Sequence, residues 1–223
     1  MPTTLELIEA LAASATPVRR LRPPLLRAGF WLLLAGLVLL AAAGLYGTRP
    51  DLVLRLRQPT FALALAGSLL TGILAAVAAF HLSLPDRSRL WLLLPAPALL
   101  LWASTIGYGC LTDWVRIGPE GVRLGTTLEC FRTLATTGLP LSAALLLMLR
   151  HAAWLHPRSV AMVGGLAVAG IVATALSLLH GIDATVMVLL WNFGTVILAV
   201  VLGGVFSRSM FAWAWTLPRS PNG

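Results

Sequence analysis

The sequence predicts an all-α protein that folds as a six-helix transmembrane bundle with its N and C termini in the cytoplasm. Hydrophobic residues make up 58% of the 223 residues, charged residues only 11%, and the mean hydropathy is +0.89. A water-soluble globular domain of this length does not carry such a composition. The apolar residues gather in six runs of about 20 residues, which is the length a helix needs to cross a bilayer. The arginines between the runs indicate the orientation.

The six runs divide the chain into three parts. We expect a cytoplasmic amphipathic segment at residues 1–27, a transmembrane domain at 28–206 and a cytoplasmic tail at 207–223. Arginines before the first run resemble the start of a signal peptide, but the apolar core is too long and five runs follow, so we expect a retained helix. The expected spans are Ala28–Tyr46, Thr60–Phe80, Leu90–Tyr108, Phe131–Leu149, Val160–Leu179 and Ala184–Phe206.

Two features of these runs predict how the helices bend and pack. Proline lacks the backbone N–H that a helix needs, so Pro95 and Pro97 in the third run and Pro140 in the fourth predict kinks or local breaks. Small residues recur at every fourth position of the fifth run and predict a ridge along which a neighbouring helix approaches closely. The ridge consists of Ala161, Gly165, Ala169, Ala173 and Ser177.

The arginines favour a cytoplasmic N terminus. All sixteen basic residues are arginine, and with the N terminus inside, ten of them lie on the cytoplasmic side and six outside. The first outer loop, which holds Arg49, Arg55 and Arg57, is the weak point of this bias. The ten inside are Arg19, Arg20, Arg22, Arg27, Arg87, Arg89, Arg150, Arg158, Arg208 and Arg219.

The N-terminal segment predicts a short amphipathic helix. Thr3 followed by Glu6 has the spacing of a capping box, and the next apolar residues fall on one helical face. So short a helix is marginal in water and needs a surface to lie on. The bilayer is one such surface, but the acids in the helix and the absence of basic residues before Arg19 favour a protein partner. The candidate partner-binding residues are Leu5, Ile8, Leu11, Arg19, Arg20 and Arg22.

The composition limits the classes of function. The formal charge of +8 is scattered between apolar runs, so it records the orientation of the chain in the lipid bilayer, and we expect no direct binding of nucleic acid. Inside the expected spans no Asp, Glu, Lys or Arg lies well away from an end, which disfavours a transporter. No catalytic constellation stands out, so we expect a protein that is not an enzyme and needs no cofactor.

One cluster of reactive side chains is predicted at the outer side of the bundle. Two thiols, an imidazole and two carboxylates lie at the expected outer ends of the third to sixth spans. They would bind a soft metal ion through thiolate and imidazole, or form a disulfide in an oxidising compartment. The alternative is that each cysteine packs as a small hydrophobic residue. The candidates are Cys110, Glu129, Cys130, His180 and Asp183, with Cys130 and Cys110 as the metal ligands.

Several short motifs, taken in order, resemble one family. They are LIEALAASATPVRRLRPPLLRAGFW near the N terminus, GTRPDL after the first run, the pair Glu129–Cys130, and LLH at the end of the fifth run. Together they resemble the NrsF family, bacterial membrane-embedded negative regulators of an extracytoplasmic-function sigma factor named sigma F. The resemblance extends over nearly the whole chain.

The resemblance implies an anti-sigma factor. In such a protein the cytoplasmic N-terminal segment holds the sigma factor at the inner membrane, and a periplasmic heavy-metal or oxidative signal releases it. The resemblance also implies sensing through two periplasmic cysteines. Cys130 matches the first, but Gly181 stands where the second would follow the histidine. Either Cys110 has taken over that role, or this protein responds to another signal, or sensing has been lost.

Two other classes of function remain as alternatives. A small transporter or permease component would need a polar path across the membrane. A membrane thiol oxidoreductase would cycle Cys110 and Cys130, but the sequence lacks the CxxC spacing of such enzymes.

Overall fold

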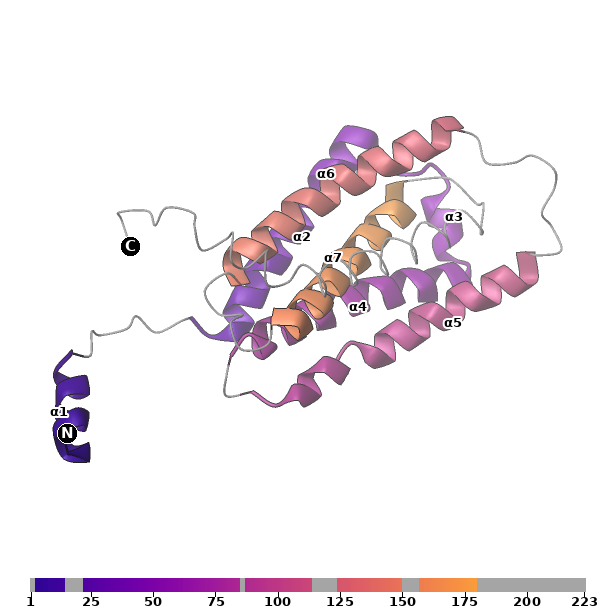
Figure 1. The fold of residues 1–223 in the computed structure, drawn as a ribbon. Helices are drawn as coiled ribbons and strands as arrows, with labels where there is room; N and C mark the ends of the chain where they lie inside the picture. The colour runs from indigo at the N-terminus through magenta and orange to yellow at the C-terminus, as the bar shows by residue number, and fades with distance from the viewer. Residues whose placement is uncertain (1–2, 15–21, 85–86, 114–123, 150–156, 180–223) are drawn as a thin grey trace.

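The computed structural model of the chain is all-helical over the residues it describes, which are 3–14, 22–84, 87–113, 124–149 and 157–179. This part of the chain contains no strand, so the predicted all-α class is confirmed there (Figure 1). The elements are α1 (Thr4–Ser14), α2 (Pro24–Tyr46), α3 (Leu52–Leu56), α4 (Pro59–Leu82), the 3₁₀ helix η1 (Arg89–Leu93), α5 (Ala96–Asp113), α6 (Leu124–Leu149) and α7 (Pro157–Leu179).

Four of these helices are long and apolar enough to cross a membrane, which indicates a membrane protein. They correspond to the first, second, fourth and fifth expected spans. The sixth expected span, Ala184–Phe206, and the C-terminal tail lie outside the described residues. The four candidate spans are Pro24–Tyr46, Pro59–Leu82, Arg132–Leu149 and Arg158–Leu179.

The third expected span is divided at its prolines, as their positions predict. Here the chain forms η1 and then α5, with Pro95 between the two elements and Pro97 in the first turn of α5. Proline is tolerated in a first turn because the N–H it lacks would have no partner inside the helix. The apolar stretch that includes η1 and the first part of α5, Arg89–Thr105, is shorter than the four candidate spans. Around Pro140 the helix does not break, because α6 continues through that residue, and the alternative of a kink there stays a prediction.

Helix α7 is the most enclosed of the candidate spans. In its most apolar stretch 67% of the residues are buried, against 22% in α2. It packs on α4, α6 and α2, and Figure 1 shows it between α6 and α2 on one side and α4 and α5 on the other. The core of the described bundle therefore lies around α7.

The close approach of α4 and α7 depends on glycine. A Cβ atom built on Gly170 would lie only 2.7 Å from the backbone nitrogen of Gly72. Near this point the hydroxyls of Ser68 and Thr174 lie 3.0 Å apart and share a hydrogen bond across the interface. The predicted small-residue ridge is buried at Ala169, but the closest contact is made by Gly170, one position away from it.

The helices alternate in direction, which brings distant parts of the chain to two ends of the bundle. At one end, which we call the Arg27 end, α2 begins and α4 and α6 finish: the Arg27 guanidinium lies 5.3 Å from the centre of the Phe80 ring and donates to the carbonyl of Met148. The rings of His81 and Trp91 stack there at 4.0 Å, so η1 starts at the same end. At the opposite end, which we call the Arg49 end, α2 and α7 finish and α6 begins.

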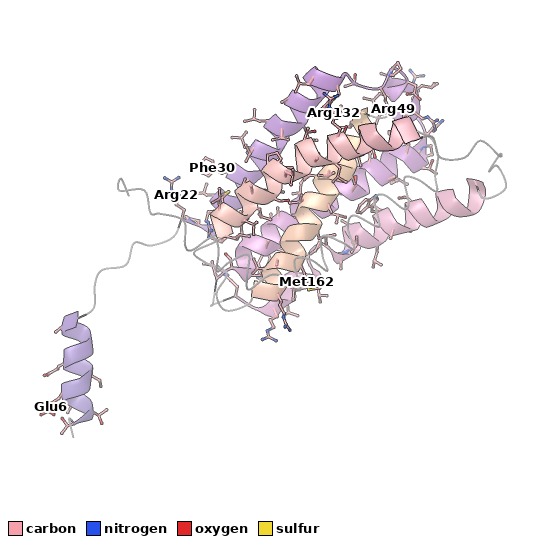
Figure 2. The ribbon with its side chains drawn as sticks, turned by 45° about the horizontal axis from the view of Figure 1, so that its top comes forward. Glu6, Arg22, Phe30, Arg49, Arg132 and Met162 are labelled. Carbon is pink, nitrogen blue, oxygen red and sulfur yellow. The ribbon has the colours of Figure 1, made fainter. Side chains whose placement is uncertain are left out.

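Helix α1 lies apart from the bundle (Figure 1). It precedes the Arg27 end in the chain, and residues 15–21, which connect it to α2, lie outside the described residues. Figure 2 shows Glu6 on this separate helix, Arg22 near the start of α2, and Arg49 and Arg132 together at the far end of the bundle.

Candidate functional site

The N-terminal helix is capped as its sequence predicts. The backbone N–H of Thr3 donates to Glu6 Oε2 at 2.8 Å, and the backbone N–H of Glu6 donates to Thr3 Oγ1 at 3.4 Å. These two reciprocal bonds form the capping box and satisfy donors that the first turn of a helix leaves free.

The apolar face of this helix is open. Leu5 is 72% exposed and Ile8 is 58% exposed. The side chain of Leu11 is not among those described, and Arg19 and Arg20 lie outside the described residues. Arg22 is described and exposed. The predicted partner-binding face is therefore accessible at the two positions where the structure describes it.

The candidate thiol cluster is described only through its helices. Cys110 lies near the end of α5, and Glu129 and Cys130 lie in the second turn of α6, but the side chains of these three residues are not described. His180 and Asp183 lie outside the described residues. Figure 1 shows α5 and α6 on opposite flanks of the bundle, with α7 and α4 between them.

No group of three or more His, Cys, Asp and Glu residues that could hold a metal is found in the part of the chain that the structure describes. Because all five predicted members of the cluster fall outside the described side chains, this finding does not test them. The metal-binding set stays a prediction.

The GTRPDL motif forms a compact turn at the Arg49 end. Gly47 has a φ of 75°, a conformation that side chains disfavour, and its N–H closes α2 on the carbonyl of Ala43 at 2.9 Å. Arg49 is buried and holds Asp51 with two hydrogen bonds, from Nε at 2.7 Å and from Nη2 at 3.0 Å. Arg55 of α3 donates to the same carboxylate at 3.3 Å. Two of the arginines that weaken the orientation bias thus have a structural role here.

This pairing explains the ionisation of Asp51. The hydrogen bonds from the Arg49 guanidinium, followed by its charge and a hydrogen bond from Arg55, lower the pKa of Asp51 from 3.8 to about 2, although partial desolvation opposes the shift. The carboxylate is therefore ionised throughout the physiological range.

The same turn joins α2 to α7. The backbone N–H of Arg49 donates to the carbonyl of Leu178 at 3.2 Å, in the last turn of α7. The Arg49 guanidinium lies 5.7 Å from the centre of the Phe61 ring in α4. Two motifs of the family resemblance, GTRPDL and LLH, are thus in direct contact although they are far apart in the sequence.

Helix α2 also meets α6 close to Cys130. The Arg132 guanidinium lies 5.1 Å from the centre of the Tyr46 ring, and the Tyr46 hydroxyl lies 3.4 Å from Thr136 Oγ1. Arg132 follows Cys130 by two residues on the same helix. The Arg49 end therefore links α2 to the helix that carries the matched cysteine and to the helix that precedes His180.

The buried Arg27 was missed by the sequence interpretation, which placed it in the segment before the first span. It is 8% exposed, its Nη2 donates to the Met148 carbonyl, and its Nη1 is buried without a hydrogen-bond partner among the described residues. Carbonyls in the last turn of a helix have no hydrogen-bond donor within the helix, and Arg27 supplies a donor to one of these carbonyls in α6. Pro24, a residue type favoured at the first position of a helix, was the signal that α2 begins before Arg27.

Comparison with known proteins gives the family of the chain. The model of the family described as "NrsF: Negative regulator of sigma F" matches residues 11–213. No curated protein matches the chain, and no solved structure matches it. The match begins at Leu11, within α1, and continues through the Arg27 end, the GTRPDL turn and the region of Cys130. The chain therefore belongs to the NrsF family, the negative regulators of sigma F.

Proposed function

We propose that this protein is an inner-membrane anti-sigma factor that holds an extracytoplasmic-function sigma factor at the cytoplasmic face and releases it on a periplasmic signal. The observation that carries the proposal is the family match over residues 11–213. The four candidate spans support a membrane location. The protein acts by binding, without catalysis and without a cofactor, in a bundle of six spans.

The arginine bias supports an orientation in which the Arg27 end faces the cytoplasm and the Arg49 end faces the periplasm. In this orientation α1 is cytoplasmic and offers Leu5 and Ile8, both exposed, to the sigma factor. Exposed leucine and isoleucine on a short helix that lies apart from the bundle are typical of a segment that docks into an apolar groove of a partner.

The proposed partner contact is tested by reversing the polarity of that face. We expect Leu5→Asp with Ile8→Asp to abolish co-purification with the sigma factor of the same organism that the wild-type protein captures, because two charges cannot enter an apolar groove without losing their hydration. Ala13→Asp is the matched control, since Ala13 is exposed on the other side of the helix. Undiminished binding by the double variant would remove α1 from the proposal.

The proposed sensor is centred on Cys130, with Cys110 as the second thiol in place of the residue missing at Gly181. Thiolate binding of a soft metal such as cadmium, or oxidation by chromate, would change how the helices pack at the periplasmic end. We expect Cys130→Ser to blunt induction of the regulon by both agents. If Cys110 has taken over the second role, Cys110→Ser has the same effect. A normal response from the Cys130 variant would show that this thiol is a packing residue.

A further inference from the structure

At the Arg49 end, α2 contacts α6, which carries Cys130, and the chain just beyond α2 contacts α7, which precedes His180. Its last residue, Tyr46, lies beneath the Arg132 guanidinium of α6 at 5.1 Å and has its hydroxyl 3.4 Å from Thr136 Oγ1. Just beyond α2, the Arg49 N–H holds the Leu178 carbonyl of α7 at 3.2 Å. By contrast, α5 packs on α4 and η1. A change at the start of α6 or the end of α7 therefore reaches α2 directly.

The turn that follows α2 at the Arg49 end is firmly held. The Arg49 guanidinium binds Asp51 through two nitrogens, in a geometry that restricts both side chains, and Arg55 binds the same carboxylate. Helix α2 then runs without an internal proline from Tyr46 back to Pro24. Because the helix is continuous, a displacement of one end moves the other.

The contact at the Arg27 end is less complete. Arg27 donates from Nη2 to the Met148 carbonyl and lies over Phe80, but its Nη1 is buried with no hydrogen-bond partner among the described residues. A buried cation whose hydrogen bonds are incomplete loses part of the stabilisation that full pairing would give. An alternative arrangement that returns Arg27 to water or to a better acceptor can therefore compete with the observed one.

We infer that α2 is the coupling helix of the protein, which transmits a displacement of α6 or α7 at the Arg49 end to the N-terminal segment. The Arg27–Met148 contact stabilises the partner-binding state. Helix α2 contacts α6, and the chain just beyond it contacts α7, at the Arg49 end. In the sequence α2 directly follows α1, with no other helix between them among the described elements. This inference rests on the proposed anti-sigma function. It assigns Arg27 a positioning role, since Arg27 acts through α2 and does not itself touch the partner.

The test measures transcription from a promoter that depends on the sigma factor that the wild-type protein captures, in the absence of any inducer. Arg27→Met keeps an unbranched side chain in place of the arginine methylenes but removes the charge and the donors to Met148, and we expect it to raise basal output at least tenfold at unchanged membrane abundance. Arg27→Lys keeps the charge and a donor, and should keep output near that of the wild type. Wild-type repression by Arg27→Met would overturn the inference.

A control distinguishes loss of the Arg27–Met148 contact from a general loss of stability. Gly170→Ala weakens the α4–α7 interface and leaves the contacts of Arg27 intact. It should therefore retain repression when its abundance in the membrane equals that of the wild type. Equal derepression by Gly170→Ala and Arg27→Met would mean that Arg27 acts only through stability. If Arg27→Met does not accumulate, Phe80→Leu takes its place, because it removes the ring beneath the guanidinium. We expect Phe80→Leu to raise basal transcription twofold or more. Unchanged transcription would refute the proposed role of the Arg27–Met148 contact.

Deletion of the whole gene distinguishes this inference from the function on which it rests. Unchanged output in the deletion strain would reject the anti-sigma function itself, and the coupling role with it. Increased output in the deletion strain, together with wild-type repression by Arg27→Met, would reject only the role of α2.

Discussion

Replacing Gly170 with alanine should destabilise the protein, because α4 and α7 approach each other through their backbones. The added Cβ would lie 2.7 Å from the Gly72 nitrogen, 2.8 Å from the Gly72 Cα and 2.8 Å from the Ser68 carbonyl oxygen. These atoms belong to backbone, so no side chain can rotate away. Relief requires the two helices to separate by roughly 0.7 Å, since ordinary contacts begin near 3.4 Å.

The expected loss follows from two opposing effects. Overpacking of a tight interface costs about 1–3 kcal/mol, and separation also stretches the Ser68–Thr174 hydrogen bond, which is worth roughly 0.6 kcal/mol in a membrane bundle. Alanine offsets part of this loss, because it favours a helix over glycine by about 0.5–1 kcal/mol. We expect a net loss of about 0.6–3 kcal/mol, which for a chain of this size lowers the melting temperature by roughly 1–12 °C.

Unfolding of the detergent-solubilised protein by SDS or heat, followed by circular dichroism, measures this loss. Gly36→Ala in α2 is the matched control, because a Cβ at Gly36 meets nothing within 4 Å. That variant should be as stable as the wild type or slightly more so. The packing argument fails if Gly170→Ala unfolds at the same SDS concentration and temperature as Gly36→Ala.

Two further predictions concern the Arg49 end and the core. Asp51 has a pKa lowered to about 2 by Arg49, so its ionised form stabilises the fold above the unfolded value of 3.8, and that stabilisation is lost as the pH falls toward 2. The difference in melting temperature between the wild type and Asp51→Asn should therefore be constant above about pH 5 and shrink below about pH 4; a difference that varies between pH 5 and 8 would contradict this. Trp31 is fully buried and donates from Nε1 to the Leu141 carbonyl at 3.2 Å, so Trp31→Phe should cost about 1–3 kcal/mol through the lost hydrogen bond and the space left behind. Equal SDS resistance of the two proteins would show that the hydrogen bond and the larger ring of Trp31 add nothing to stability.

The features that the sequence predicted correctly depend on residues close together in the chain. The four candidate spans follow from the density of apolar residues, which is a local property. The capping box needs only Thr3 and Glu6, and the division of the third run needs only Pro95 and its neighbours. Each of these depends on hydrogen bonding or steric restriction within about one helical turn.

The features that could not be predicted depend on residues far apart. Arg27 and Met148 are separated by 121 positions, and nothing local marks a helix end as the acceptor for a distant guanidinium. Likewise, the sequence predicted small residues at an interface of α7, but it did not identify Gly170 as the contact, since that depends on how α4 is rotated. For the thiol cluster the prediction depended on which helix ends meet, and the described part of the chain does not include its side chains.

The two arginine contacts also explain why α2 is suited to coupling. Met148 and Leu178 are each the second-last residue of their helix, where carbonyls lack a partner within the helix and leaving them unpaired near lipid is costly. Arg27 and Arg49, at opposite ends of α2, supply donors to these two carbonyls. Any rearrangement that moves α6 or α7 relative to α2 breaks these two hydrogen bonds, and the carbonyls must then exchange these donors for others. Such an exchange favours two discrete arrangements over a continuous range, which is the property that a switch between holding and releasing a partner requires.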